Sequence, residues 1–168
     1  MVKKISSVAL LLLSTLAIAS SANAKSNKDM IWHQDKQNTF KAYTTALNSS
    51  HVDAFISSKN SNITFGLVWE NTKYCKDKEG IIDDAAVFYV DGQPIKTTIS
   101  CYQHKYVNNI VSTKNGTEYV ANLFYNKGND GQVKITLKSS DGDTNYLFTS
   151  KEFGKLYTFL QNTIKKPL

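Results

Sequence analysis

The chain of 168 residues is 41% hydrophobic, 20% charged and 11% aromatic, with only 8 Gly and 2 Pro. This composition is too apolar and too aromatic for a disordered or collagen-like protein, so we expect the chain to fold. The longest apolar stretch lies within the first two dozen residues. No second stretch is long enough to cross a bilayer, which excludes a polytopic membrane protein.

The first 24 residues have the pattern of a cleaved secretory signal peptide. Two lysines precede an apolar run over 8–19, and Ala-Asn-Ala at 22–24 supplies the small residues that a signal peptidase requires. We therefore expect a single globular α+β domain over 25–168, located in the periplasm or secreted. The short Lys-Lys signal is typical of bacteria.

All 20 basic residues are lysines, and they are spread along the chain among acidic residues. Loss of the signal would lower the formal net charge from +6 to +4. Nucleic-acid recognition favours clustered arginine, so we expect no nucleic-acid partner.

The chain contains only two cysteines, Cys75 and Cys101. Both belong to the part of the chain that export would deliver to an oxidising compartment. Their spacing is far from C-x-x-C and neither has an adjacent histidine, which argues against metal binding or redox chemistry. We predict one structural disulfide.

The mature chain begins with helical spacing. Phe40, Tyr43 and Leu47 recur at i, i+3 and i+7, which predicts a helix over 34–48. A second, short helical turn is expected near 50–56.

Extended structure follows. Apolar and polar residues alternate over 63–70, which predicts a strand, and the lysine-rich segment 71–80 is expected to be a loop. Asp91-Gly92 favours a two-residue hairpin turn, which would pair Phe88 with Ile95 and gather apolar side chains on one face.

The last third contains three further predicted elements. A turn at Asn115-Gly116 is expected to lead into a strand over 118–125. A second hairpin at Asp141-Gly142 would set Leu137 opposite Tyr146. Thr149 and Glu152 are expected to form a capping box for a C-terminal helix.

These elements predict an α+β fold with an N-terminal helix or helix pair, an antiparallel β-meander of about five to six strands, a C-terminal helix and one disulfide.

One segment resembles a calcium-loop template. Asp141, Asp143, Asn145 and Glu152 fall on positions 1, 3, 5 and 12 of that template. Tyr146 stands at position 6, where the loop requires glycine, and the residues before the loop alternate like a strand. The hairpin explains this segment better than a metal site, and we expect no metal and no cofactor.

A candidate binding surface lies on the face opposite the apolar one. It consists of Tyr89, Lys96, Tyr102, His104 and Tyr106. Tyrosines present a large rigid area with a polar tip, which protein-binding surfaces favour. The alternatives are that a helix covers this face or that it is only the solvated side of the sheet.

Catalytic signatures of the common hydrolase, zinc-peptidase, dinucleotide and phosphate-loop types are absent, and the three histidines lie in different segments. The sequence therefore favours a small exported binding protein, of inhibitor or immunity type, that engages another protein through a sheet surface. The alternatives are a secreted hydrolase with a histidine and carboxylate brought together by folding, and an envelope structural component. The sequence leaves the oligomeric state open.

Overall fold

A computed structural model describes residues 30–59 and 62–165 of the chain. The predicted signal peptide over 1–24 lies outside the described residues. No helix in the described part is long and apolar enough to cross a membrane.

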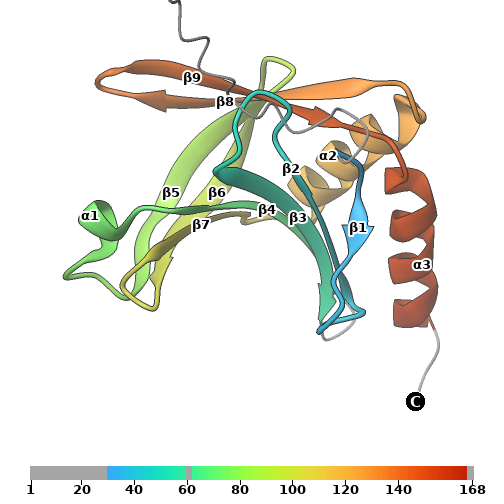
Figure 1. Cartoon of the computed structure of the whole chain (residues 1–168), viewed down its shortest axis with the longest axis horizontal. Coiled ribbons are helices and arrows are strands. Elements are labelled where there is room, and N and C mark those ends of the chain that lie inside the picture. Colours follow the sequence, from blue (N-terminus) through green and yellow to red (C-terminus); the bar gives the residue numbers. More distant parts are fainter. Residues whose placement is uncertain (1–29, 60–61, 166–168) are drawn as a thin grey trace, which may run out of the picture.

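Nine antiparallel strands form one strongly curved sheet, in the order β1-β2-β3-β4-β7-β6-β5-β8-β9 (Figure 1). The strands are β1 (His33–Gln34), β2 (Lys41–Thr45), β3 (Val52–Lys59), β4 (Asn62–Glu70), β5 (Gly80–Val90), β6 (Gln93–Tyr102), β7 (Tyr106–Val111), β8 (Gln132–Ser139) and β9 (Gly142–Thr149). The antiparallel sheet and its mixture with helices were predicted, but the prediction of five to six strands was too low. The order is also not a simple meander, because β4 lies beside β7 and not beside β5.

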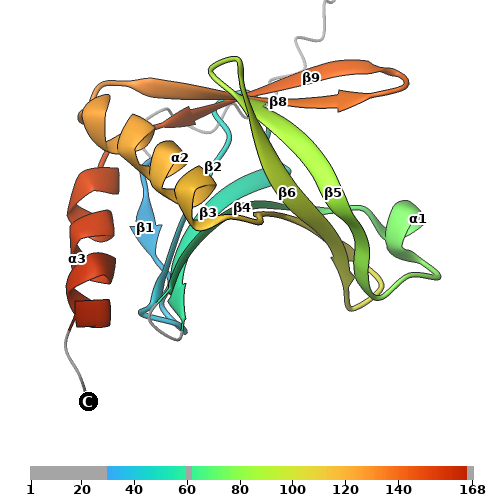
Figure 2. The same cartoon turned by 180° about the vertical axis from the view of Figure 1, so that it is seen from behind.

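Three helices accompany the sheet in the described residues. The single-turn helix α1 (Thr72–Cys75) lies between β4 and β5, α2 (Lys114–Asn126) lies between β7 and β8, and α3 (Phe153–Lys165) follows β9. β3 and β4 bend into an arch, and α2 and α3 lie on its convex side in both views (Figures 1 and 2). The concave side carries no helix in the described part of the chain.

An aromatic cluster fills the core between the sheet and the two long helices. The buried Trp32 ring packs edge-on against Phe124 and Phe153, with ring centroids 5.4 and 4.9 Å away. Its Nε1 donates a hydrogen bond to the Thr149 carbonyl at 2.7 Å. Because Trp32 precedes β1 and Thr149 ends β9, this side chain joins the two ends of the sheet.

The predicted helices over 34–48 and near 50–56 are wrong. These residues form β1, β2 and the first half of β3. The buried side chains of β2 and the residue after it are Ala42, Thr44 and Ala46, which alternate with period two. They are small and weakly apolar, whereas Phe40, which suggested the helical period, is 50% exposed.

The predicted strand over 118–125 is also wrong, because these residues belong to α2. Thr113 caps the helix, its hydroxyl accepting a hydrogen bond from the Gly116 amide. Thr117, Val120 and Phe124 follow at helical spacing and are buried.

Both predicted hairpins form. The register of the first is confirmed, with Phe88 opposite Ile95. In the second, Leu137 lies opposite Thr144, a shift of two residues from the predicted register. A shift of two leaves every side chain on its predicted face, because strand side chains alternate with period two.

The C-terminal helix is confirmed as α3, but the predicted capping box is wrong. The Thr149 hydroxyl accepts a hydrogen bond from the Lys151 amide at 3.1 Å. The Glu152 backbone has a φ of 67°, and its amide donates to the Asn129 side chain at 3.1 Å. The connection from α2 to β8 therefore supplies the partner for the start of α3.

Candidate functional site

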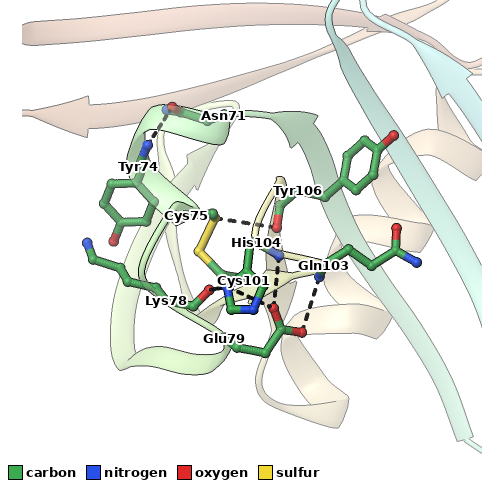
Figure 3. The surroundings of a disulfide bond; sticks show 9 residues. All are labelled: Asn71, Tyr74, Cys75, Lys78, Glu79, Cys101, Gln103, His104 and Tyr106. Atoms are coloured by element: carbon green, nitrogen blue, oxygen red, sulfur yellow. Dashed lines mark hydrogen bonds and ion pairs between the residues drawn. A yellow bond between two sulfur atoms is a disulfide. The ribbon is translucent and has the colours of Figure 1, made fainter.

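Residues 71–79 connect β4 to β5 and are called the crossing segment. They have to pass β7 and β6, because these two strands separate β4 from β5 in the sheet. Asn71 begins the segment and caps α1, its side chain accepting a hydrogen bond from the Tyr74 amide at 3.0 Å. Cys75 at the end of α1 forms a disulfide with Cys101 of β6, with the two Cα atoms 5.6 Å apart (Figure 3). The predicted disulfide is confirmed, and it ties the crossing segment to the sheet.

A small second core lies around the disulfide. Cys75, Cys101 and Val107 are buried together, and the partly buried Trp69 and Ile99 pack against them. This apolar support holds the crossing segment against the lower ends of β6 and β7 (Figure 1).

The turn between β6 and β7 has an unusual backbone. Gln103 and His104 have φ values of 54° and 52°, and the Lys105 amide donates to the Tyr102 carbonyl at 3.2 Å. Consecutive left-handed residues in a hairpin turn favour Asn-Gly. A residue with a Cβ atom loses roughly 1–2 kcal/mol in this conformation.

Glu79, at the end of the crossing segment, holds this turn. Its carboxylate accepts hydrogen bonds from the Gln103 amide at 3.1 Å and from the His104 amide at 3.0 Å (Figure 3). The hydrogen bond from the His104 amide is the main reason that the pKa of Glu79 lies below its ordinary value. The His104 ring also contacts the Lys78 carbonyl through Nδ1 at 3.1 Å.

Two tyrosines flank the turn on the face opposite the disulfide. Tyr102 and Tyr106 are directly opposed in the β6–β7 register, and Tyr102 is 55% exposed. The Lys105 ammonium lies 5.1 Å from the centre of the Tyr106 ring and 3.2 Å from a carboxylate oxygen of Glu70. The hydrogen bond to Glu70 is the main reason that the pKa of Lys105 is raised.

The candidate binding surface is thus divided. Tyr102 and Tyr106 come together beside the β6–β7 turn on the face opposite the disulfide, whereas the His104 ring lies against Lys78 and Glu79 of the crossing segment (Figure 3). Tyr89 and Lys96 lie towards the other end of β5 and β6, and six residues of strand between Lys96 and Tyr102 correspond to about 20 Å. The Lys138 ammonium makes a cation–π contact with Tyr89, at 4.6 Å from the centre of its ring.

The residues of the calcium-loop template do not converge. Asp141, Asp143 and Asn145 lie along the β8–β9 turn and strand β9, and Glu152 stands at the start of α3. The Asn145 side chain instead accepts a hydrogen bond from the Thr136 hydroxyl at 2.6 Å. Within 30–59 and 62–165, no three histidine, cysteine, aspartate or glutamate side chains are grouped so that they could hold a metal ion.

His104 and Glu79 bring an imidazole near a carboxylate, as the hydrolase alternative would require. Nδ1 of His104 is 3.8 Å from Oε2 of Glu79, which is longer than a hydrogen bond. The two side chains are 62% and 46% exposed, and both carboxylate oxygens accept amide hydrogen bonds. This arrangement fixes the backbone of the turn and does not favour general acid–base catalysis.

Sequence reasoning missed Glu79. It lies 25 residues from His104 in the chain, and no local spacing links the two. Comparisons of the chain with protein-family models, with curated proteins and with solved structures find no match.

Proposed function

We propose that the protein is an exported binding protein that contacts another protein with the corner around the β6–β7 turn. The binding residues are Tyr102, His104 and Tyr106. The backbone at Gln103 and His104 carries this proposal. Unfavourable backbone conformations are retained where the surrounding structure enforces them, and they cluster at functional sites.

The supports beneath the corner keep it rigid. Glu79 fixes the turn amides, and the Cys75–Cys101 disulfide fixes the crossing segment from which Glu79 comes. A rigid surface loses little conformational entropy on binding, which suits a protein of inhibitor or immunity type. The disulfide is also compatible with export to an oxidising compartment.

Site-specific photocrosslinking in the native host tests the proposal. A benzoylphenylalanine replaces Tyr102 in one variant and Tyr125 of α2 in the other. The two tyrosines are 55% and 54% exposed, so they are matched in accessibility. We expect one discrete crosslinked protein from position 102 and none from position 125.

Binding of that crosslinked protein is then measured with purified components. Tyr102→Ala should weaken binding by a factor of about 10–30, as for a central interface tyrosine, and Tyr125→Ala should leave it unchanged. Equal crosslinking at both positions, or equal affinities of the two alanine variants, would refute the proposed corner.

A further inference from the structure

Helices α2 and α3 touch at one end and separate at the other (Figure 2). Where they touch, Phe124 of α2 stacks on Phe153 of α3 with ring centroids 5.0 Å apart. The Tyr125 ring packs edge-on against the Tyr157 ring, with ring centroids 6.5 Å apart. The first turn of α2 and the last turn of α3 lie at the open end of this V-shaped pair (Figures 1 and 2).

A cavity of about 440 Å³ lies in the open end of the V. Aliphatic side chains from three elements line it, namely Ile63 of β4, Val111 of β7 and Ile164 of α3. The polar part of its lining includes hydroxyl and amide groups from Thr113, Thr117, Tyr157 and Gln161. Its volume falls in the range of roughly 300–1,000 Å³ that is typical of small-molecule sites.

The charges of the described lining residues cancel. Among these residues Lys114 and Glu118 are charged, and they pair with each other at 3.8 Å, one helical turn apart. Burial raises the pKa of Tyr157, and Gln161 hydrogen-bonds its hydroxyl. Tyr157 therefore presents an uncharged hydroxyl group to the cavity.

We propose that this cavity binds a small, neutral, amphipathic molecule. Its apolar part would pack on Ile63, Val111 and Ile164, and its hydrogen-bonding group would face Tyr157 and Gln161. An ionised ligand would lose hydration without gaining an unpaired opposite charge from the described residues of the lining. The ends of α2 and α3 that border the cavity lie away from the β6–β7 turn in both views (Figures 1 and 2), so this proposal does not depend on the proposed function.

Two fluorescent dyes test the proposal on the purified protein. N-phenyl-1-naphthylamine is neutral, and 8-anilino-1-naphthalenesulfonate has the same rings with an added sulfonate. We expect the neutral dye to bind with a saturable rise in fluorescence and the sulfonate to bind about tenfold more weakly or not at all. Equal binding of the two dyes, stronger binding of the sulfonate, or no binding of the neutral dye would overturn the proposal.

A matched pair of α3 variants locates the dye. Gln161→Trp places a large ring in the lining, whereas Asn162→Trp changes the next residue, which is exposed and does not line the cavity. Gln161→Trp should weaken binding of the neutral dye by about tenfold, and Asn162→Trp should not, with both variants retaining the unfolding temperature of the wild type. Equal binding by both variants would place the dye elsewhere and refute the site.

The chain's own C-terminal residues are the competing occupant, because 166–168 follow α3 directly. A variant that ends at residue 165 distinguishes the two. Binding of the neutral dye by the full chain supports the proposal. Binding gained only after removal of 166–168 would mean that this segment fills the cavity, and the proposal would be wrong.

Discussion

Replacement of His104 by glycine should make the protein more stable. His104 has a φ of 52° in a turn whose preceding residue is also left-handed. Glycine adopts this conformation without the steric penalty of a Cβ atom. Substitution of an exposed residue of the proposed binding corner is thus expected to strengthen the fold while it removes a side chain from the binding surface.

The magnitude follows from two opposing contributions. Relief of the left-handed backbone is worth roughly 1–2 kcal/mol. Glycine offsets part of this gain, because its backbone has more conformational entropy in the unfolded chain than that of histidine. Loss of the exposed contact between the His104 ring and the Lys78 carbonyl, at 3.1 Å, removes about 0.5 kcal/mol more. We expect a net stabilisation of up to about 1 kcal/mol, which corresponds to at most roughly 2–4 °C in Tm.

Equilibrium urea unfolding of the oxidised protein measures this change, and His51→Gly provides the control. His51 is also an exposed turn residue, but its φ is not positive. Glycine at position 51 should cost about 0.5–1 kcal/mol through the entropy of the unfolded chain. The two histidine-to-glycine variants should therefore change stability in opposite directions. If His104→Gly destabilises the protein as much as His51→Gly does, the backbone of the turn stores no strain and the argument for the corner fails.

Three further outcomes are expected. Replacing Cys75 and Cys101 together by serine should lower the free energy of unfolding by about 3–4 kcal/mol in urea, because the bridge spans 26 residues. Trp32→Phe should cost about 2–3 kcal/mol in the same assay, since it leaves the Thr149 carbonyl without its donor and a small void in the core. Glu79→Gln should lower Tm at neutral pH. Because the pKa of Glu79 is lowered by folding, its contribution is present above the ordinary carboxyl pKa, and the difference in Tm should vanish as the pH falls through the lowered value.

The parts of the fold that the sequence predicts best are those fixed by local chemistry. Asp91-Gly92 sets the turn of the first hairpin, and the apolar alternation beside it allows one register only. In the second hairpin, Gly142 does not occupy the turn as predicted but begins β9 with a φ of 119°. Ser140 and Asp141 form the turn before Gly142, and the register is therefore shifted by two residues from the predicted one.

The errors arise where apolar spacing is ambiguous. In β2 the buried positions hold small residues, while the larger Tyr43, and Phe40 before the strand, are exposed. The spacing of the large side chains therefore suggests a helix, although the buried residues alternate as in a strand. In α2 the Asn115-Gly116 pair favours a turn by its composition, although it lies in the first helical turn after the cap at Thr113. Tertiary packing decides the structure of β2. In α2 the cap at Thr113 and the helical spacing of Thr117, Val120 and Phe124 are the sequence signals that indicate the helix.

The candidate site was predictable only in part. Alternation along β6 correctly assigns Tyr102 and Lys96 to one face. Their distance along the strand also follows from their spacing in the sequence. The contribution of Glu79 depends on how the segment from β4 to β5 crosses the sheet. Crossing connections bring together residues that are distant in the chain, and these contacts have no local signature.

The same crossing explains why the disulfide and the Glu79 carboxylate lie so close together in the chain. A connection that passes two strands has few apolar contacts of its own, and a single turn of helix covers little surface. The disulfide at Cys75 anchors its middle, and Glu79 anchors its end to the β6–β7 turn. Reduction should therefore loosen the turn before the rest of the sheet opens. Hydrogen exchange of the Gln103 and His104 amides should accelerate on reduction while that of β3 amides does not, and equal acceleration at both places would show that the disulfide stabilises the fold as a whole and not the corner.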